Sequence, residues 1–305
     1  MAMSELDDIP AVPAGKVGWP WQSCAERESK ASDERNPWPR ITIVTPSFNQ
    51  GTFLEQTLRS VLLQGYPNLE YLVLDGGSSD DSVGILNRYG RHLAYWHSRS
   101  DAGQADAIAT GFERATGEIY GYVNSDDILL PGALKHVARK FMRFRKTGVV
   151  YGNRLVVDED GKVIGRHFWP YFLSRYHWAC GQPLAQESCF WRKDAYWDVG
   201  GIDRSKFFVL DYDLFYRMWM KTRFRKTRAF LGCIRVHGDT KRARHDDIRL
   251  QEMALARSRY ALREPGYFRV RVMNLLDRAQ VSFDTLAERV FGSNAPCTDA
   301  RGERE

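Results

Sequence analysis

The sequence predicts an α/β protein built on a doubly wound, mostly parallel sheet. Short apolar strands alternate with helix-length segments from Arg40 to Leu130, the order that parallel strands with crossover helices require. Each of these strands ends in polar or bend-forming residues, which are typical of the loops between strands and helices. Apolar residues make up 43% and aromatic residues 13% of the chain, a composition typical of a globular protein.

The individual elements follow from this alternation. Helices are expected over 52–64, 82–89 and 104–115, then from Pro131 to about Lys146, and the chain is typical of helix from Asp246 onward. Residues 148–165 predict a hairpin that turns at Asp160 and Gly161, so the sheet is expected to become mixed. The strands of the first half are ITIVTPS (41–47), LEYLVLDGG (69–77), HLAYWHS (92–98) and EIYGYVNSDD (118–127).

Charge and cysteine content limit the classes of function. The net charge of +6 fits anionic substrates, anionic lipid head groups and nucleic acid equally well. The five cysteines form no C-x-x-C pair, so they indicate neither a zinc site nor a disulfide framework and fit a reducing cytoplasm. We expect neither a signal peptide nor a membrane-spanning helix, because the N-terminus lacks an apolar segment and no apolar run of about 18 residues occurs.

The segment Ile119–Leu130 carries the clearest functional signal. Its apolar strand ends in Asn124, Ser125, Asp126 and Asp127, and adjacent carboxylates cost free energy unless a cation or hydrogen-bond donors offset them. A hard divalent ion with oxygen ligands is the natural partner, and ligands of open α/β sheets bind outside the carboxyl ends of the strands. The alternative is an Asx-rich turn that caps the following helix.

The other parallel strands are expected to bring polar groups to the same edge. Phe48 follows the first strand and can pack on a base, Asp75 ends the second and can accept from a base N–H or a ribose hydroxyl, and Asp101 follows the third. Each has a structural alternative, since Gly76 and Gly77 can simply form a turn. The coincidence of four strand ends favours a binding site.

Six segments then carry a resemblance to a known family. In order they are TPSFNQ, LDGGSSDDS, DAGQADAIATGF, TGEIYGYVNSDD, GGID and LDYDLFYRM, and over residues 39–240 they resemble the family 2 glycosyltransferases of the GT-A fold. The resemblance implies a nucleoside-diphosphate sugar donor, usually a UDP-sugar, with Mn or Mg, and inversion at the anomeric carbon. It also implies a saccharide or lipid-linked saccharide acceptor, as in polysaccharide or glycoconjugate synthesis.

The resemblance assigns roles to individual residues. Pro46 and Phe48 match the start of the nucleotide pocket, Asp75 matches the base-binding turn, and Asp101 and Asp106 match the donor-binding loop. The remaining matches surround the diphosphate and the acceptor: Asn124 and Asp126 at the ends of the metal-binding D-x-D element, Asp127 directly after it, His237 near the diphosphate, and Asp211 as the catalytic base.

The chain departs from the family pattern at three positions. Gly76 stands where the base-binding turn usually has a second Asp, which weakens the expectation of uracil. Asn124 begins the D-x-D element with a neutral oxygen, and Leu210 replaces an acidic residue before Asp211. The structural alternatives are a helix N-cap for Asp211 and a surface-loop histidine for His237.

These observations define an expected organisation. Residues 1–38 form an N-terminal extension pinned by Trp19 and Trp21, 39–127 a nucleotide-binding half, 128–240 an acceptor half, and 241–305 a helical C-terminal extension. An apolar stripe in that extension is flanked by arginines, and we expect it to pack on the catalytic domain or to contact an anionic membrane surface. Its apolar members are Val272, Leu275, Leu276, Ala279, Leu286 and Val290.

Two other classes of function remain open from the sequence. A catalytically silent nucleotide-sugar-binding module would not need both Asp126 and Asp211. A basic nucleic-acid-binding protein would need arginines interleaved with aromatic residues in a motif, and none is present.

Overall fold

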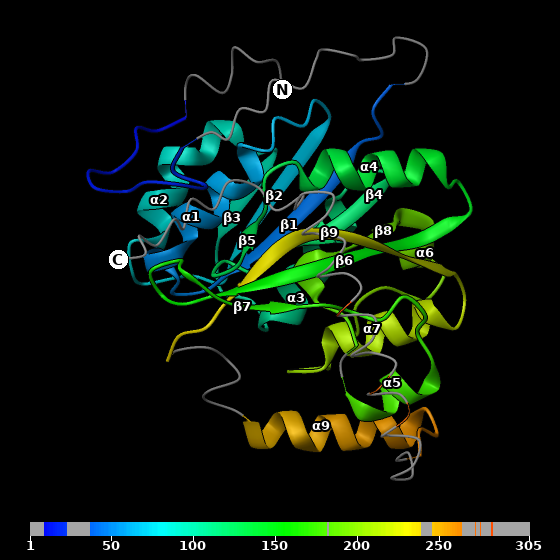
Figure 1. Cartoon of the computed structure of the whole chain (residues 1–305). Coiled ribbons are helices and arrows are strands. Elements are labelled where there is room, and N and C mark those ends of the chain that lie inside the picture. The colour runs from blue at the N-terminus through cyan, green and yellow to red at the C-terminus, as the bar shows by residue number, and fades with distance from the viewer. Residues whose placement is uncertain are drawn as a thin grey trace, which may run out of the picture.

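The computed structural model describes residues 9–22, 37–181, 183–238 and 246–263, with Val272, Leu275 and Ser282 as isolated positions. A single mixed sheet runs through the described part of the chain in the order β3-β2-β1-β4-β8-β6-β9-β5, with β7 paired to β6. Helices cover both of its faces (Figure 1). The sequence prediction of a doubly wound α/β architecture is therefore confirmed.

The parallel half of the sheet consists of β1 (Ile41–Ser47), β2 (Leu69–Asp75), β3 (Tyr95–Ser98) and β4 (Ile119–Tyr122). Ser47 pairs with Asp75, and Asp75 pairs with Ser98, so the ends of three strands lie side by side. Between these strands run α1 (Gly51–Leu62), α2 (Ser82–Tyr89), the short 3-10 helix η2 (Gly90–His92) and α3 (Gln104–Arg114).

Alternation along the strands separates two cores. Ile41 and Ile43 of β1 point to the face covered by α1, α2 and α4 (Ala133–Arg143), whereas Val44 points to the face covered by α3. Because successive strand residues face opposite sides, strands buried on both faces read as continuous apolar runs. This is why the strand positions could be read from the sequence.

The second half makes the sheet mixed, as expected. The strand β6 (Thr147–Val157) forms the predicted hairpin with β7 (Val163–His167) and also pairs with β8 (Cys189–Arg192) and β9 (Arg223–Arg235). The sequence did not predict that β9 would lie parallel to β6 and then pair with the short β5 (Ile128–Leu129). This pairing brings residues 235–237 to the end of β4.

The remaining helices lie on the α3 side of the sheet (Figure 1). They are α5 (Arg175–Cys180), the 3-10 helix η3 (Gln186–Ser188), α6 (Lys193–Trp197), α7 (Leu210–Trp219) and α9 (Asp246–Arg259).

The N-terminal segment is pinned as expected. Nε1 of Trp19 donates to the carbonyl of Leu129 at 2.7 Å, and the buried Arg59 donates to the carbonyls of Pro10 and Pro20. Residues 9–22 therefore pack on α1 and on β5.

The helix α9 docks on the domain. Met253, Ala256 and Leu262 are buried in the same core as α7, and the Tyr260 and Tyr216 rings stack with their centroids 4.2 Å apart. Most of the predicted apolar stripe lies outside the described residues, although Val272 and Leu275 are described and are 41% and 69% exposed. Among the described residues, no helix is long and apolar enough to cross a bilayer.

Candidate active site

The polar end of β4 is the centre of the site. Oδ2 of Asp126 lies 3.1 Å from Nε2 of His237, which follows β9, and the His237 ring packs against Phe53 of α1 with centroids 4.6 Å apart. Asp126 and His237 are 111 residues apart in sequence, and the pairing of β9 with β5 and β6 brings them together. The structure thus joins two of the three predicted metal ligands.

Asp127, the third predicted ligand, points into the protein. Its Oδ2 accepts from Asn124 at 3.1 Å and from Gln186 at 2.9 Å, while Oδ1 accepts from the backbone N–H of Arg235 at 3.3 Å. Burial and the charge of Asp126 raise the pKa of Asp127 well above its ordinary value. Its role as a metal ligand stays a prediction, and its observed contacts organise the loop.

Asn124 connects the loop after β4 to the start of α3, in the part of the predicted pocket that is expected to bind the sugar donor. Its Oδ1 accepts from Nε2 of Gln104, the first residue of α3, at 2.7 Å, while its amide group donates to Asp127. The neutral Asn at the start of the D-x-D element therefore supplies both a donor and an acceptor, which an aspartate could not.

Arg235 is a residue that the sequence motifs did not indicate. It is almost fully buried, its Nε donates to the carbonyl of Asp126 at 3.1 Å, and its Nη1 donates to the carbonyls of Asp158 and Glu159 at 3.0 and 2.8 Å. The guanidinium also lies 4.8 Å from the Phe53 ring centroid. In the sequence, only its position two residues before His237 relates Arg235 to the predicted site.

Glu187 is a second residue that no sequence motif indicated. It is 1% exposed, and among the described residues its nearest charged partner is Nη1 of Arg154 at 3.9 Å, with no hydrogen bond to either carboxylate oxygen. Burial raises the pKa of Glu187, Arg154 opposes this, and the charges of Asp211 and Asp126 raise it further. It lies in η3, which precedes β8 and bonds through Gln186 to Asp127.

Residues of the predicted nucleotide pocket lie together where β1, β2 and β3 end. A Cβ atom on Gly76 would lie 3.2 Å from Oδ2 of Asp101 and 3.3 Å from Cδ2 of Phe48, so these three residues are in contact range. Phe48 is 60% exposed, and burial raises the pKa of Asp101. A side chain at position 76 would require Asp101 or Phe48 to shift by a few tenths of an ångström, so the glycine allows their present close approach.

Asp75 and Pro46 are more deeply buried than we expect of side chains that contact a ligand. Both carboxylate oxygens of Asp75 are occupied, since they accept from Ser78 N–H at 2.9 Å, Gly77 N–H at 3.2 Å, the Ser78 hydroxyl and the Ser98 hydroxyl at 2.6 Å. Pro46 is buried within β1. Their roles in nucleotide binding stay predictions, and in the structure Asp75 fixes the 76–78 turn.

Asp106 lies in the first turn of α3, and its carboxylate contacts other groups of the protein. Its Oδ2 accepts from the Ala102 N–H at 3.2 Å, and its Oδ1 forms an ion pair with Arg204. Arg204 also contacts Glu113 further along α3. The predicted donor contact of Asp106 is untested, but the ion pair ties α3 to the segment that leads into α7.

The predicted base, Asp211, lies in the first turn of α7, and its Oδ1 accepts from the Tyr212 N–H at 2.8 Å. Burial raises the pKa of Tyr122 in β4, and the charges of Asp211, Glu187 and Asp127 raise it further. The role of Asp211 as the base stays a prediction.

The donor set at Asp126 fits a divalent cation of the Mn or Mg type. A partly exposed carboxylate and an imidazole converge there, and such ions commonly bind through one or two protein ligands together with substrate phosphates. Within the described part of the chain, no group of three His, Cys, Asp or Glu side chains could hold a metal ion.

Solved structures of glycosyltransferases share this fold. Residues 1–349 of S. aureus TarS, in complex with UDP-GlcNAc, match with a TM-score of 0.54 at 14% identity, over 71% of this chain and 66% of that fragment. The mannosyltransferase PcManGT of Pyrobaculum calidifontis, in complex with GDP-Man and Mn2+, matches with a TM-score of 0.55 at 17% identity, over 76% of this chain and 70% of that one. The fold is therefore that of the GT-A glycosyltransferases.

The chain belongs to glycosyl transferase family 2, whose family model matches residues 42–200. An uncharacterized glycosyltransferase of Mycobacterium tuberculosis is 38% identical over 90 residues, which cover 29% of this chain and 34% of that protein. The hyaluronan synthase of Pasteurella multocida is 25% identical over 207 residues, 67% of this chain and 21% of that protein. An uncharacterized glycosyltransferase of Rickettsia bellii is 26% identical over 130 residues, which span 42% of this chain and only 19% of that relative.

Proposed function

We propose that this protein transfers a sugar from a nucleoside-diphosphate sugar, with UDP as the expected nucleotide, to a hydroxyl group of an acceptor. The observation that carries the proposal is the contact between Asp126 and His237 at the end of β4, supported by the influence of the Asp211 charge on Tyr122 of the same strand. Membership in glycosyl transferase family 2 supports the reaction class, and the related folds that hold UDP-GlcNAc or GDP-Man with Mn2+ support the class of donor.

Each residue has a role in a single displacement with inversion. Phe48 and Asp101 would hold the nucleoside end of the donor, beside the backbone of Gly76. Asp126 and His237 would hold a divalent cation, which when bound neutralises charge on the departing diphosphate. Asp211, in the first turn of α7, would accept the proton of the acceptor hydroxyl, which in an inverting displacement attacks from the side opposite the diphosphate.

The acceptor is proposed to be a saccharide or a lipid-linked saccharide. The basic character of the chain, with 44 Lys and Arg against 38 Asp and Glu, suits an acceptor or a membrane surface that carries negative charge. Peripheral contact with the inner face of a membrane, and a cytoplasmic location, belong to this proposal.

A catalytically silent nucleotide-sugar-binding module is the second candidate. It would also explain Phe48, Asp101 and Asp126, but it gives no reason for a carboxylate at position 211. A measurement of sugar transfer distinguishes the transferase from the silent binding module.

The test uses the full chain with Mn2+ and a panel of UDP-, GDP- and dTDP-sugars. Thermal shift identifies the nucleotide, and release of the nucleoside diphosphate together with glycosylated acceptor measures transfer. We expect one nucleotide class to stabilise the protein and its sugar to be transferred. Stabilisation without transfer to any hydroxyl acceptor, or to water, would favour the silent module, and no stabilisation by any donor would overturn the proposal.

A further inference from the structure

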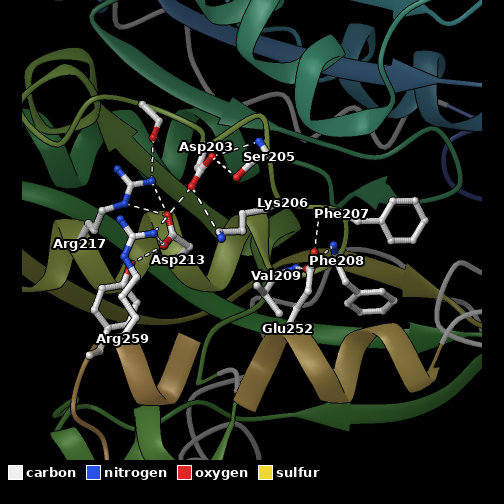
Figure 2. A network of polar contacts seen from close by, with 12 residues as sticks. Asp203, Ser205, Lys206, Phe207, Phe208, Val209, Asp213, Arg217, Glu252 and Arg259 are labelled. Carbon is white, nitrogen blue, oxygen red and sulfur yellow. Dashed lines mark hydrogen bonds and ion pairs between the residues drawn. The ribbon is translucent and has the colours of Figure 1, made fainter. Parts of the chain in front are cut away.

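The segment that leads into α7 is held by a carboxylate from the C-terminal helix. Oε1 of Glu252 accepts from the Phe207 N–H at 2.9 Å, and Oε2 accepts from the Phe208 and Val209 N–H groups at 2.7 and 3.0 Å (Figure 2). The helix α7 begins at the next residue, Leu210, and Asp211 follows it. One side chain of α9 therefore binds three consecutive amides directly before the predicted base.

The three contacts are charge-assisted. Burial alone would raise the pKa of Glu252, but the hydrogen bonds from Phe207, Val209 and Phe208 hold it below its ordinary value, so the carboxylate is ionised at neutral pH. Backbone N–H groups at a helix start have no partner within the helix and carry partial positive charge, which makes an anion the matching ligand. Ionised acceptors form hydrogen bonds about twice as strong as neutral ones.

A second contact joins the same two helices one turn further along. The buried carboxylate of Asp213 receives an ion pair from Arg217 at 2.6 Å and a hydrogen bond from the Tyr260 hydroxyl, and Nη1 of Arg259 lies 3.8 Å from both Asp213 and Asp203 (Figure 2). Asp211 lies between the positions held by these two contacts. Its backbone is thus fixed from both sides by residues 252–260.

Packing and polar contacts together hold the segment before α7. Val209 and Leu210 are buried in the core that also contains Met253 and Ala256 of α9, and Phe208 packs against it. Residues 199–204 border a cavity of about 480 Å³, which Arg217 and Arg259 also line. The hydrogen bonds to Glu252 add to the packing a directional restraint on three consecutive amides.

We propose that Glu252 is a positioning residue for Asp211, so that α9, which lies outside the region matched by the family model, is part of the catalytic unit. This inference rests on the proposed function of Asp211 as the base. A general base must lie within hydrogen-bond reach of the acceptor proton, and a displacement of about 1 Å can cost on the order of 100-fold in rate. Removing Glu252 leaves three amides without their acceptor and frees the start of α7.

The experiment compares Glu252→Gln and Glu252→Ala in the full chain, each alone and combined with Asp211→Asn. Glu252→Gln keeps the size and one acceptor oxygen, so it is expected to fold and to retain part of the effect. Asp247→Asn is the matched control, because it removes an exposed carboxylate from the first turn of the same helix. The measurements are kcat, the KM for the donor, the affinity for the donor by calorimetry with Mn2+, and the melting temperature.

Loss of positioning predicts a specific pattern. We expect kcat to fall by roughly 10-fold in Glu252→Gln and up to about 100-fold in Glu252→Ala, with donor affinity unchanged and Asp247→Asn like the wild type. In the Asp211→Asn background the same changes should have little further effect, because the group that they position is already gone. Such a dependence on residue 211 would not arise from general destabilisation.

Three results would overturn the inference, and a fourth would show that the assignment of the base is wrong. Wild-type kcat in Glu252→Gln and Glu252→Ala, or an equal loss of kcat in the presence and absence of the Asp211 carboxylate, contradicts positioning. A parallel loss of donor affinity and melting temperature in Glu252→Gln also contradicts it, since the residue would then only stabilise the fold. If Asp211→Asn alone keeps wild-type turnover, the assignment of the base is wrong and the inference falls with it.

Discussion

Asp126 and Asp127 are adjacent in sequence but differ in environment. Asp126 is partly exposed and meets His237, whereas Asp127 is 2% exposed and already accepts from Asn124, Gln186 and Arg235. A carboxylate that is buried with hydrogen-bond partners is less available to a cation than one that faces a second ligand. Asp126 should therefore carry most of the metal dependence.

Asp126→Ala tests this assignment. We expect the variant to fold normally, because residue 126 follows the strand, and to lose the Mn2+-dependent part of donor affinity. Thermal shift with the donor, with and without Mn2+, measures the difference, and Asp160→Ala in the exposed β6–β7 turn is the control. Equal donor affinity with and without metal in wild type would show that no such ion is used, and an unchanged metal effect in Asp126→Ala would place the ion elsewhere.

Asp211→Asn tests the base. The amide keeps the shape of the side chain but cannot accept a proton, so turnover should fall by about 100- to 10,000-fold while donor binding persists. The neighbouring Asp213 is a poor substitute, because Arg217 and Tyr260 already occupy its carboxylate. Asp213→Asn should instead lower the melting temperature, and near-normal turnover in Asp211→Asn would require a different base.

The sequence could locate some residues at the edge of the sheet that carries the predicted site but not others, and the direction of the strands explains the difference. Carboxyl ends of parallel strands meet at one edge, so Asp75, Asp101 and Asn124 could be grouped from the sequence alone. Glu187 could not, because it precedes β8, an antiparallel strand that begins at this edge instead of ending there. Nothing in the local sequence gives the direction of that strand.

At the scale of elements, helices and strands of the first half followed closely from their periodicity. The helix predicted over 82–89 matches α2, and the one predicted over 104–115 differs from α3 by one residue. The helix expected to reach Lys146 ends at Arg143, and the strand expected from His92 begins at Tyr95 because residues 90–92 form a 3-10 turn. The parallel pairing of β6 with β9 was not predictable, because it joins segments far apart in sequence with no helical crossover pattern.

The contact between α4 and β9 contains a histidine that should make stability depend on pH. Nε2 of His136 lies 2.7 Å from Oγ1 of Thr227, and burial, with the charges of Lys140 and Arg139, lowers the pKa of His136 from 6.5 to about 4. The unfolded chain binds this proton as the pH falls below 6.5, whereas the folded protein does not until about pH 4. The stability contribution is therefore complete above pH 6.5 and declines towards pH 4.

His136→Gln isolates this contribution. From pH 7 to pH 5, the wild type should lose about 2 kcal/mol more unfolding free energy than the variant, which keeps a polar group for Thr227 but cannot titrate. Urea denaturation at both pH values gives the difference, and titration of all other groups cancels between the two proteins. Parallel pH profiles would show that His136 is protonated as readily in the folded protein as in the unfolded chain.

At the scale of the whole molecule, positive charge is distributed unevenly. Residues 128–157 and 214–238 contain no Asp or Glu, and the parallel pairing of β6 with β9 places Thr147 beside Arg223, so the basic starts of both strands lie together. The other ends of these strands reach the Asp126 side, where Arg235 contacts the β4 loop. Cations therefore gather at the sheet edge away from the predicted site, around Arg143, Arg145, Lys146, Lys221 and Arg223.

The last prediction concerns an anionic membrane surface. Residues after Arg263 contain four arginines around the predicted apolar stripe, at positions 269, 271, 278 and 289. We expect the full chain to co-sediment with vesicles that contain anionic lipid, more strongly at low salt, because each basic residue near such a surface contributes about 1 kcal/mol and salt screens it. Removal of this segment should weaken the binding.

The structure determines where the chain should be cut for this test. A chain that ends near Asp246 would lose α9 and the residues directly after it, of which Met253, Ala256 and Leu262 are part of the core, so reduced binding could reflect misfolding. A chain that ends at Arg263 keeps α9 and removes only the segment beyond it, which carries the apolar stripe and its four arginines. Lower recovery of that chain would support membrane contact by the C-terminal segment. Equal recovery of both chains would indicate that the basic region at the starts of β6 and β9 makes the contact. The double substitution Arg143→Glu and Arg223→Glu should then abolish binding. No recovery of the full chain at low salt would contradict membrane contact altogether.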